Sequence, residues 1–160
     1  MSKIFLLTGH VHSGKTSRLA EWVASNKSID GILAPILNQR RYLMDIHTSE
    51  KRLLEVDKDH NSSSAITVGK YFFSCEVFEW GCKKLMEAHN KAPNWIVIDE
   101  FGPLELRGNG LSNAIEYIMS NRNSLTKTKL LFVVRNKLVN AFRHHFNLPL
   151  QEATKFEYDT

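Results

Sequence analysis

The segment Gly9–Thr16 reads G-H-V-H-S-G-K-T and constrains this chain more than any other feature. It fits the pattern G-x-x-x-x-G-K-[S/T], in which glycines let the backbone curl so that consecutive N–H groups face inward. An apolar strand pattern, Lys3–Thr8, precedes it, and a helical pattern, Thr16–Lys27, follows it. Inward N–H groups and the positive end of a helix hold phosphate. We therefore expect a strand, a phosphate-binding loop and a helix at the start of the fold.

The residues of this loop have expected places in phosphate binding. The Lys15 ammonium should reach the β- and γ-phosphates of a nucleotide, and the Thr16 hydroxyl should bind Mg²⁺. His10 and His12 occupy variable positions, where their side chains either face solvent or make pH-sensitive contacts to phosphate. The expected nucleotide-binding residues of the loop are Gly9, His10, Val11, His12, Ser13, Gly14, Lys15 and Thr16.

An apolar run, Trp95–Ile98, ends in two adjacent carboxylates, Asp99 and Glu100. Beside a phosphate-binding loop, the terminal acid of such a strand, Asp99, would hold Mg²⁺ through water. Because side chains alternate along a strand, Glu100 points elsewhere, where it can orient or deprotonate an attacking water. We expect Lys15, Asp99 and Glu100 to be catalytic, and Thr16 and Asp99 to bind metal.

The same stretch permits a second interpretation. Asp99–Gly102 reads D-E-F-G, which also fits the D-x-x-G of GTP-binding switches, where the glycine amide senses the γ-phosphate. Such switches carry N-K-x-D after a later strand, whereas here Asn136–Leu138 is followed by Val139 instead of an acid. A site without a buried polar group to read the base discriminates weakly. We therefore expect loose base selectivity.

For each of three charged residues near these strand ends, the sequence allows two roles. Arg135 follows the apolar strand pattern Leu130–Val134 and either stabilises charge on the γ-phosphate or lies on the surface. We include Arg135 among the expected nucleotide-binding residues. Glu105 and Arg107, in P-L-E-L-R, either face the nucleotide or form surface ion pairs.

Strand and helix patterns alternate along the rest of the chain, which predicts an α/β domain with a largely parallel central sheet. The runs Tyr42–His47 and Arg52–Val56 predict a small β-hairpin insertion, followed by a loop, Asp57–Ser64. A length of 160 residues predicts a single domain over residues 1–160. The other expected strands are Gly31–Leu37, Trp95–Ile98, Leu130–Val134 and Lys155–Tyr158, and the other expected helices are Glu76–Asn90, Leu111–Met119 and Asn136–Phe146.

Composition argues against several other classes of protein. Hydrophobic residues at 42% and charged residues at 24% are ordinary for a globular chain and argue against disorder. No apolar run approaches the roughly 18 residues that span a bilayer, and the first residues lack a signal-peptide pattern, so we expect a cytoplasmic protein without a membrane partner. The net charge of +4 suits phosphates but does not indicate nucleic acid, and nothing identifies a protein partner. Cys75 and Cys82 predict neither a disulfide nor a zinc site.

Together these motifs resemble the small P-loop nucleoside-triphosphatase family of the cancer-related nucleoside-triphosphatase type. The likeness covers roughly Lys3 to Phe146 and includes W-I-V-I-D-E-F-G-P-L-E-L, which is similar to the family's D-E-I-G-x-M-E-L. It also includes Val68–Tyr71 followed by Glu76–Phe78 at the head of a helix. The chain departs from the family at Leu43, where R-x-G-F usually places a glycine.

The resemblance implies Mg²⁺-dependent hydrolysis of several nucleoside triphosphates, ATP and GTP among them, to diphosphate and phosphate. It implies a P-loop NTPase three-layer sandwich related to nucleotide kinases and RecA-like ATPases, with nucleotide contacts along Gly9–Thr16 and around Val97–Leu104. The implied contacts in the second stretch include Val97, Ile98, Asp99, Glu100, Phe101 and Gly102. Two alternatives stay open. One is a nucleotide-binding switch or assembly factor with incidental hydrolysis, in which nucleotide orders Asp57–Ser64 or the hairpin for a partner. The other is a small-molecule or nucleotide kinase.

Overall fold

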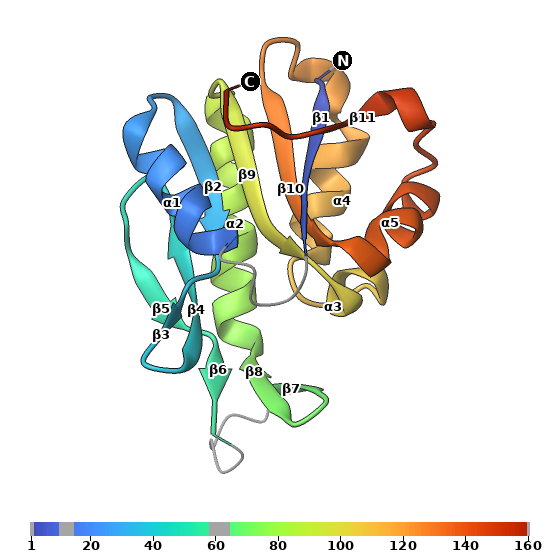
Figure 1. The fold of residues 1–160 in the computed structure, drawn as a ribbon. Coiled ribbons are helices and arrows are strands. Elements are labelled where there is room, and N and C mark those ends of the chain that lie inside the picture. Colours follow the sequence, from blue (N-terminus) through green and yellow to red (C-terminus); the bar gives the residue numbers. More distant parts are fainter. Residues whose placement is uncertain (1, 10–14, 58–64, 160) are drawn as a thin grey trace.

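The computed structural model describes residues 2–9, 15–57 and 65–159, in which a central sheet carries helices on both faces (Figure 1). The middle of the sheet is parallel, as the alternation of elements predicts, with the strand order β11-β1-β10-β9-β2. These strands are β1 (Ile4–Gly9), β2 (Ile29–Leu33), β9 (Trp95–Phe101), β10 (Lys129–Arg135) and β11 (Ala153–Lys155).

The predicted hairpin continues the sheet beyond β2 in antiparallel pairing. Its first arm, β4 (Arg40–Asp45), pairs with β2, with β3 (Ile36–Leu37) and with β5 (Lys51–Leu53). The predicted second arm, Arg52–Val56, is wrong in extent, because the chain changes partners at Leu54. The Leu54 side chain is buried, and β6 (Glu55–Val56) beyond it joins a separate sheet.

That separate sheet is small and antiparallel, with the order β6-β8-β7. Its hairpin consists of β7 (Ala65–Val68) and β8 (Tyr71–Ser74), which the patterns above do not predict as strands. The turn contains Gly69 in the left-handed region, at φ +58°, where glycine is free of the Cβ penalty. Most of the predicted loop before this hairpin, residues 58–64, lies outside the described residues.

The helices divide between the two faces of the sheet. One face of the sheet is covered by α1 (Lys15–Ser25) and is called here the α1 face. Its hydrophobic cluster contains Leu19 of α1 and the alternate β9 residues Trp95 and Val97. The intervening β9 residues, Ile96 and Ile98, pack with the opposite cluster. The helices that contribute to this opposite cluster are α2 (Cys75–Lys91), α4 (Ser112–Ser120) and α5 (Val139–His145). The sheet therefore has helices on both faces, and the domain is a three-layer sandwich. A one-turn helix, α3 (Pro103–Leu106), follows β9, and short 3₁₀ turns lie at Arg122–Ser124, Asn136–Leu138 and Leu150–Glu152.

Several predicted strands have different bounds in the structure. The strand predicted at Gly31–Leu37 ends at Leu33, shortly before Pro35, which lacks the N–H that a ladder needs. The last strand is β11, not Lys155–Tyr158. The next residue, Phe156, still donates its backbone N–H to Leu6 O at 2.8 Å, and its ring packs against Trp22 and Trp95 on the α1 face.

β9 runs on to Phe101, three residues beyond the predicted end at Ile98. Phe101 is only 1% exposed, and its ring contacts those of Phe132 and Phe142 edge to face. This apolar anchor extends the strand through both acids. Within the described ranges, no helix is both long and apolar enough to cross a membrane.

Candidate functional site

Three parallel strands, β1, β10 and β9, bring the two sequence motifs together at the edge where they end, called here the carboxyl edge. Gly9 at the end of β1 lies opposite Arg135 at the end of β10, and Val133 of β10 lies opposite Asp99 of β9. Ligands of open α/β sheets bind outside the carboxyl ends of the strands. The strand that leads into the phosphate-binding motif is thus separated from the acidic strand by β10 alone.

The phosphate-binding motif lies between two described elements, β1 and α1. Lys15 and Thr16 form the start of α1, at the helix N-terminus, as the sequence predicts. A helix N-terminus presents free N–H groups and a partial positive charge to an anion. The remaining expected loop residues lie outside the described residues: His10, Val11, His12, Ser13 and Gly14.

Asp99 is held in place at the end of β9. Its side chain is buried, at 1% exposure, and its Oδ2 accepts a hydrogen bond of 3.0 Å from the backbone N–H of Ala34, just beyond β2. Mg²⁺ prefers oxygen ligands and is usually bound by one or two carboxylates together with water and substrate phosphates. A fixed carboxylate here therefore fits a nucleotide-bound Mg²⁺. The described residues contain no cluster of three or more His, Cys, Asp or Glu side chains, and such binding needs none.

Glu100 is the extra residue of a β-bulge. The pairing with β10 passes from Val133–Asp99 directly to Val134–Phe101. Bulges re-aim side chains at strand ends, and here the Glu100 carboxylate faces a guanidinium. Glu100 Oε1 lies 3.5 Å from Arg135 Nη2, and the two side chains are 23% and 29% exposed. A carboxylate and an arginine thus stand side by side and within reach of solvent.

Glu105 is buried, at 5% exposure, so the surface ion pair predicted for it is wrong. Its side chain accepts the backbone N–H of Gly102 at 2.9 Å and that of Leu111 at 3.0 Å. Burial raises the pKa of Glu105 to about 7, against the lowering effect of these bonds. The Gly102 amide, which a GTP switch would aim at the γ-phosphate, is therefore already engaged. Arg107 is exposed and its Nε donates to Pro103 O, within its own turn.

Several expected contacts on β9 belong to the core. Val97, Ile98 and Phe101 are almost completely buried, which leaves side-chain contacts at this strand end to the polar residues. Leu43, which replaces the glycine of the resembling family, is 2% exposed. It packs at Gly81 of α2, where an added Cβ would lie 3.0 Å from Leu43 Cδ1. This departure therefore changes the packing under α2.

A family model described as NTPase matches residues 4–158. The chain belongs to this NTPase family. The match includes the phosphate-binding motif, both acids of β9 and Arg135, and it establishes a nucleotide-binding P-loop protein.

The fold of this NTPase family member also matches a solved structure. The crystal structure of THEP1 from the hyperthermophile Aquifex aeolicus superposes with a TM-score of 0.72. The match covers 98% of this chain and 89% of that chain, at 21% sequence identity. It confirms the P-loop NTPase fold that the sequence predicts. The comparison with curated proteins gave no match.

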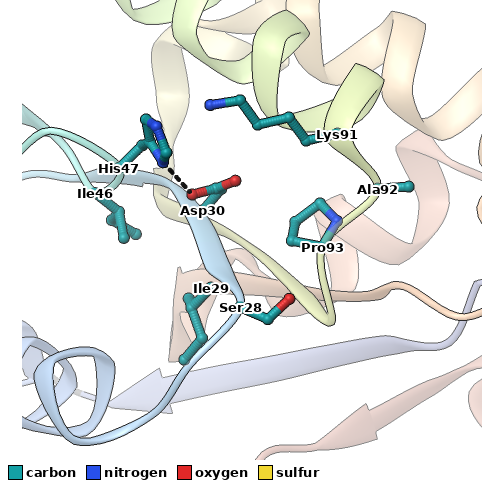
Figure 2. A pocket seen from close by; sticks show the side chains of 8 residues that line it. All are labelled: Ser28, Ile29, Asp30, Ile46, His47, Lys91, Ala92 and Pro93. Atoms are coloured by element: carbon teal, nitrogen blue, oxygen red, sulfur yellow. Dashed lines mark ion pairs between the residues drawn. The ribbon is translucent and has the colours of Figure 1, made fainter.

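The opposite end of the NTPase sheet, called here the amino edge, has a cavity of its own (Figure 2). It has a volume of about 390 Å³ and lies where β2 begins and α2 ends. His47 Nδ1 lies 3.5 Å from Asp30 Oδ1, and the Lys91 side chain extends toward the same space. The lining residues are Ser28, Ile29, Asp30, Ile46, His47, Lys91, Ala92 and Pro93.

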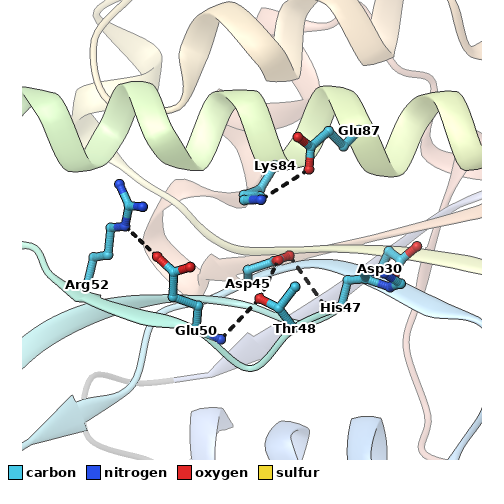
Figure 3. Close-up of polar contacts among 8 residues, drawn as sticks. All are labelled: Asp30, Asp45, His47, Thr48, Glu50, Arg52, Lys84 and Glu87. Carbon is cyan, nitrogen blue, oxygen red and sulfur yellow. Dashed lines mark hydrogen bonds and ion pairs between the residues drawn. The ribbon is translucent and has the colours of Figure 1, made fainter.

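Charges beside the amino-edge cavity are paired locally (Figure 3). The buried Asp45 carboxylate accepts the His47 N–H at 3.3 Å and the Thr48 hydroxyl at 2.8 Å, which shapes the turn between β4 and β5. The remaining ion pairs drawn there, Glu50–Arg52 and Lys84–Glu87, each join residues two or three positions apart. This region of the NTPase thus holds its own hairpin in shape.

Proposed function

We propose that the chain hydrolyses nucleoside 5′-triphosphates, ATP and GTP among them, to diphosphate and phosphate, as one P-loop domain over residues 1–160. The observation that carries the proposal is the Glu100–Arg135 pair at the carboxyl edge, beside the end of the phosphate-loop strand. Family membership supports nucleotide binding. The carboxylate can act as a general base toward water, and the guanidinium can stabilise negative charge on the γ-phosphate.

The nucleotide phosphates are held by the loop and by the start of α1. Backbone N–H groups and Lys15 neutralise the β- and γ-phosphates. Thr16 and Asp99 would hold Mg²⁺, which supplies charge neutralisation at the phosphates when bound. The Ala34 N–H fixes the Asp99 carboxylate, so this acid is positioned before the nucleotide arrives.

Glu100 is the proposed general base. Its carboxylate accepts a proton from the attacking water as the water oxygen bonds to the γ-phosphorus and the bond to the diphosphate oxygen breaks. Asp99, one residue earlier, is buried and bonded to Ala34, so the two acids have separate roles. Arg135 stands beside Glu100, where negative charge develops on the γ-phosphate, and stabilises that charge.

Loose base selectivity is part of the proposal. Val139, at the position where a guanine-reading acid stands in GTP switches, packs against the hydrophobic core. The proposal therefore excludes a preference for GTP over ATP greater than about a hundredfold, or roughly 2.7 kcal/mol.

The test is phosphate release from ATP, GTP, CTP and UTP, with and without Mg²⁺, by the wild type, Lys15→Ala and Glu100→Gln. We expect metal-dependent release from all four. Lys15→Ala should weaken nucleotide binding, and Glu100→Gln should slow release by about 100-fold or more while nucleotide stays bound. Glu87→Gln is the matched control, because the Glu87 side chain is 42% exposed and pairs with Lys84 on α2.

Two results would contradict hydrolysis as the function. Bound nucleotide with negligible release in the wild type would favour the switch. Consumption of ATP only when a small-molecule acceptor is present would favour the kinase.

A further inference from the structure

A second cavity, of about 360 Å³, lies on the α1 face beside the end of β11. This size is at the lower end of the range for small-molecule sites. Its walls come from β1, from α1 and from the segment after β11. The lining residues are Leu7, Arg18, Lys155, Phe156, Glu157, Tyr158 and Asp159.

The cavity adjoins both elements that flank the phosphate-binding loop. Leu7 lies two residues before Gly9, where β1 ends, and Arg18 lies three residues after Lys15, which begins α1. Three residues are slightly less than one helical turn, or roughly 4.5 Å along the axis. For a molecule whose phosphates bind at the start of α1, this cavity therefore lies within about one helical turn of the phosphates.

Tyr158 provides a flat ring in this wall, and the ring is held by its neighbours. The Arg18 guanidinium carbon lies 4.4 Å from the ring centroid, and the Phe156 ring lies 5.1 Å from it, edge to face. Phe156 is in turn packed against Trp22 and Trp95. The chain of aromatic contacts fixes the tail onto the sheet and leaves Tyr158 only partly buried.

The strand register places one wall of the cavity level with Asp99, because Leu7 of β1 lies opposite Val133 of β10, which lies opposite Asp99 of β9. Burial raises the pKa of the Tyr158 hydroxyl, Asp99 raises it further, and Arg18 lowers it. The cavity therefore lies in the part of the sheet that leads to the proposed hydrolytic site.

The polar residues of the cavity wall do not suit the reading of a particular base. Lys155, Glu157 and Asp159 are all exposed, and Lys155 Nζ lies 3.5 Å from Glu157 Oε1. Leaving such groups unmatched costs little, whereas a buried polar reader rejects the wrong base strongly. The wall offers an aromatic face without a buried reader.

We propose that this cavity holds the nucleobase of the nucleoside triphosphate, stacked against Tyr158, with Arg18 as a positioning residue that orients the ring. The proposal rests on the proposed function, because the phosphates must occupy the loop for the base to reach Tyr158. Every nucleobase has a π-face, so stacking binds all four bases without selecting among them. An aromatic ring without a buried hydrogen-bonding group beside it thus accounts for loose base selectivity.

The experiment compares equilibrium binding of ATP, GTP, CTP, UTP and inorganic triphosphate to the wild type and three variants. Tyr158→Leu removes the ring and should weaken binding of each nucleotide by about 5- to 100-fold, with inorganic triphosphate unchanged. Tyr158→Phe keeps the ring and should bind like the wild type. Tyr117→Leu is the matched control, because Tyr117 is an exposed tyrosine on α4, across the sheet.

Inorganic triphosphate separates a base site from a structural role for the tail. If Tyr158→Leu weakens inorganic triphosphate as much as ATP, or weakens neither, the base site is overturned. If the wild type binds inorganic triphosphate as tightly as ATP, the base site fails while the proposed function stands. If the wild type binds none of the five, the proposed function itself fails.

Discussion

The two edges of the sheet differ in chemistry, whereas cavities of similar volume, about 390 Å³ and 360 Å³, lie at the amino edge and on the α1 face beside the end of β11. At the amino edge, Asp30 pairs with His47, and neighbouring charges pair within their own elements. At the carboxyl edge, Glu100 and Arg135 stand where parallel strands end and beside a helix N-terminus. Cavity size therefore does not identify the edge that carries the candidate site. The direction of the strands does, because it decides where helix N-termini and strand-end side chains gather.

Removal of one positive charge at each edge should give the largest contrast. Arg135→Gln takes away the group proposed to stabilise charge on the γ-phosphate, so phosphate release should fall by about 100-fold or more. Lys91→Gln, at the amino-edge cavity, should leave release unchanged. Steady-state rates with ATP measure both. An equal loss in the two variants would remove the functional distinction between the edges.

Gly31 lies in the middle of β2, between the two edges of the sheet, and a substitution there tests how closely β2 packs against β9. Its φ is +123°, and an added Cβ would lie 2.1 Å from Val97 O, inside the β2–β9 pairing. We expect Gly31→Ala to lower the free energy of unfolding by about 4 kcal/mol, measured with urea. Gly69→Ala is the control, because its Cβ meets nothing within 4 Å. It should cost only about 1 kcal/mol for its left-handed φ. Similar losses in both variants would contradict the close-packing argument.

The buried Glu105 side chain should make stability depend on pH. Its pKa rises from 4.5 to about 7 on folding, mainly because of burial. Between these values the unfolded chain has lost this proton while the folded chain keeps it. The free energy of unfolding should therefore fall as pH rises from 4.5 to 7, by roughly 3 kcal/mol, and level off on either side. Glu105→Gln should lack this component, and parallel pH curves for the two proteins would refute it.

The smallest effect is expected at the amino edge. His47 is 57% exposed, and exposed ion pairs contribute about 0–1 kcal/mol. His47→Ala should therefore change the free energy of unfolding by less than about 1 kcal/mol and leave ATP affinity unchanged. A clear loss of ATP affinity by isothermal titration would mean that the amino edge takes part in nucleotide binding.

The sequence predicted the parts of the site that short motifs encode. Gly9–Thr16 and Trp95–Glu100 carry their chemistry in consecutive residues, so the sequence alone predicts the strand, the acids and the start of α1. The α/β alternation likewise predicted the parallel sheet, because strand and helix periodicities are local properties.

The remaining features depend on contacts between distant residues. The bulge at Glu100 exists only in the pairing with β10, and Asp99 bonds to Ala34, far away in sequence. For Glu105 the sequence left open a nucleotide contact or a surface ion pair, because nothing in P-L-E-L-R shows that the Leu111 N–H meets it. The Arg18–Tyr158 contact joins the first helix to the tail. Strand and helix periodicities are local, so they do not reveal contacts between residues that are far apart in the sequence.

The position of β1 between β10 and β11 sets the order in which a newly made chain can fold. Ile4 pairs with Leu130 and Ala153, both more than a hundred positions later. At a synthesis rate of about 5–20 residues per second, β1 leaves the ribosome roughly ten seconds before either neighbour exists. During that time it is an apolar strand with both edges bare, the kind of segment that chaperones shield. The capacity to bind phosphate is thus among the last properties that the growing chain acquires.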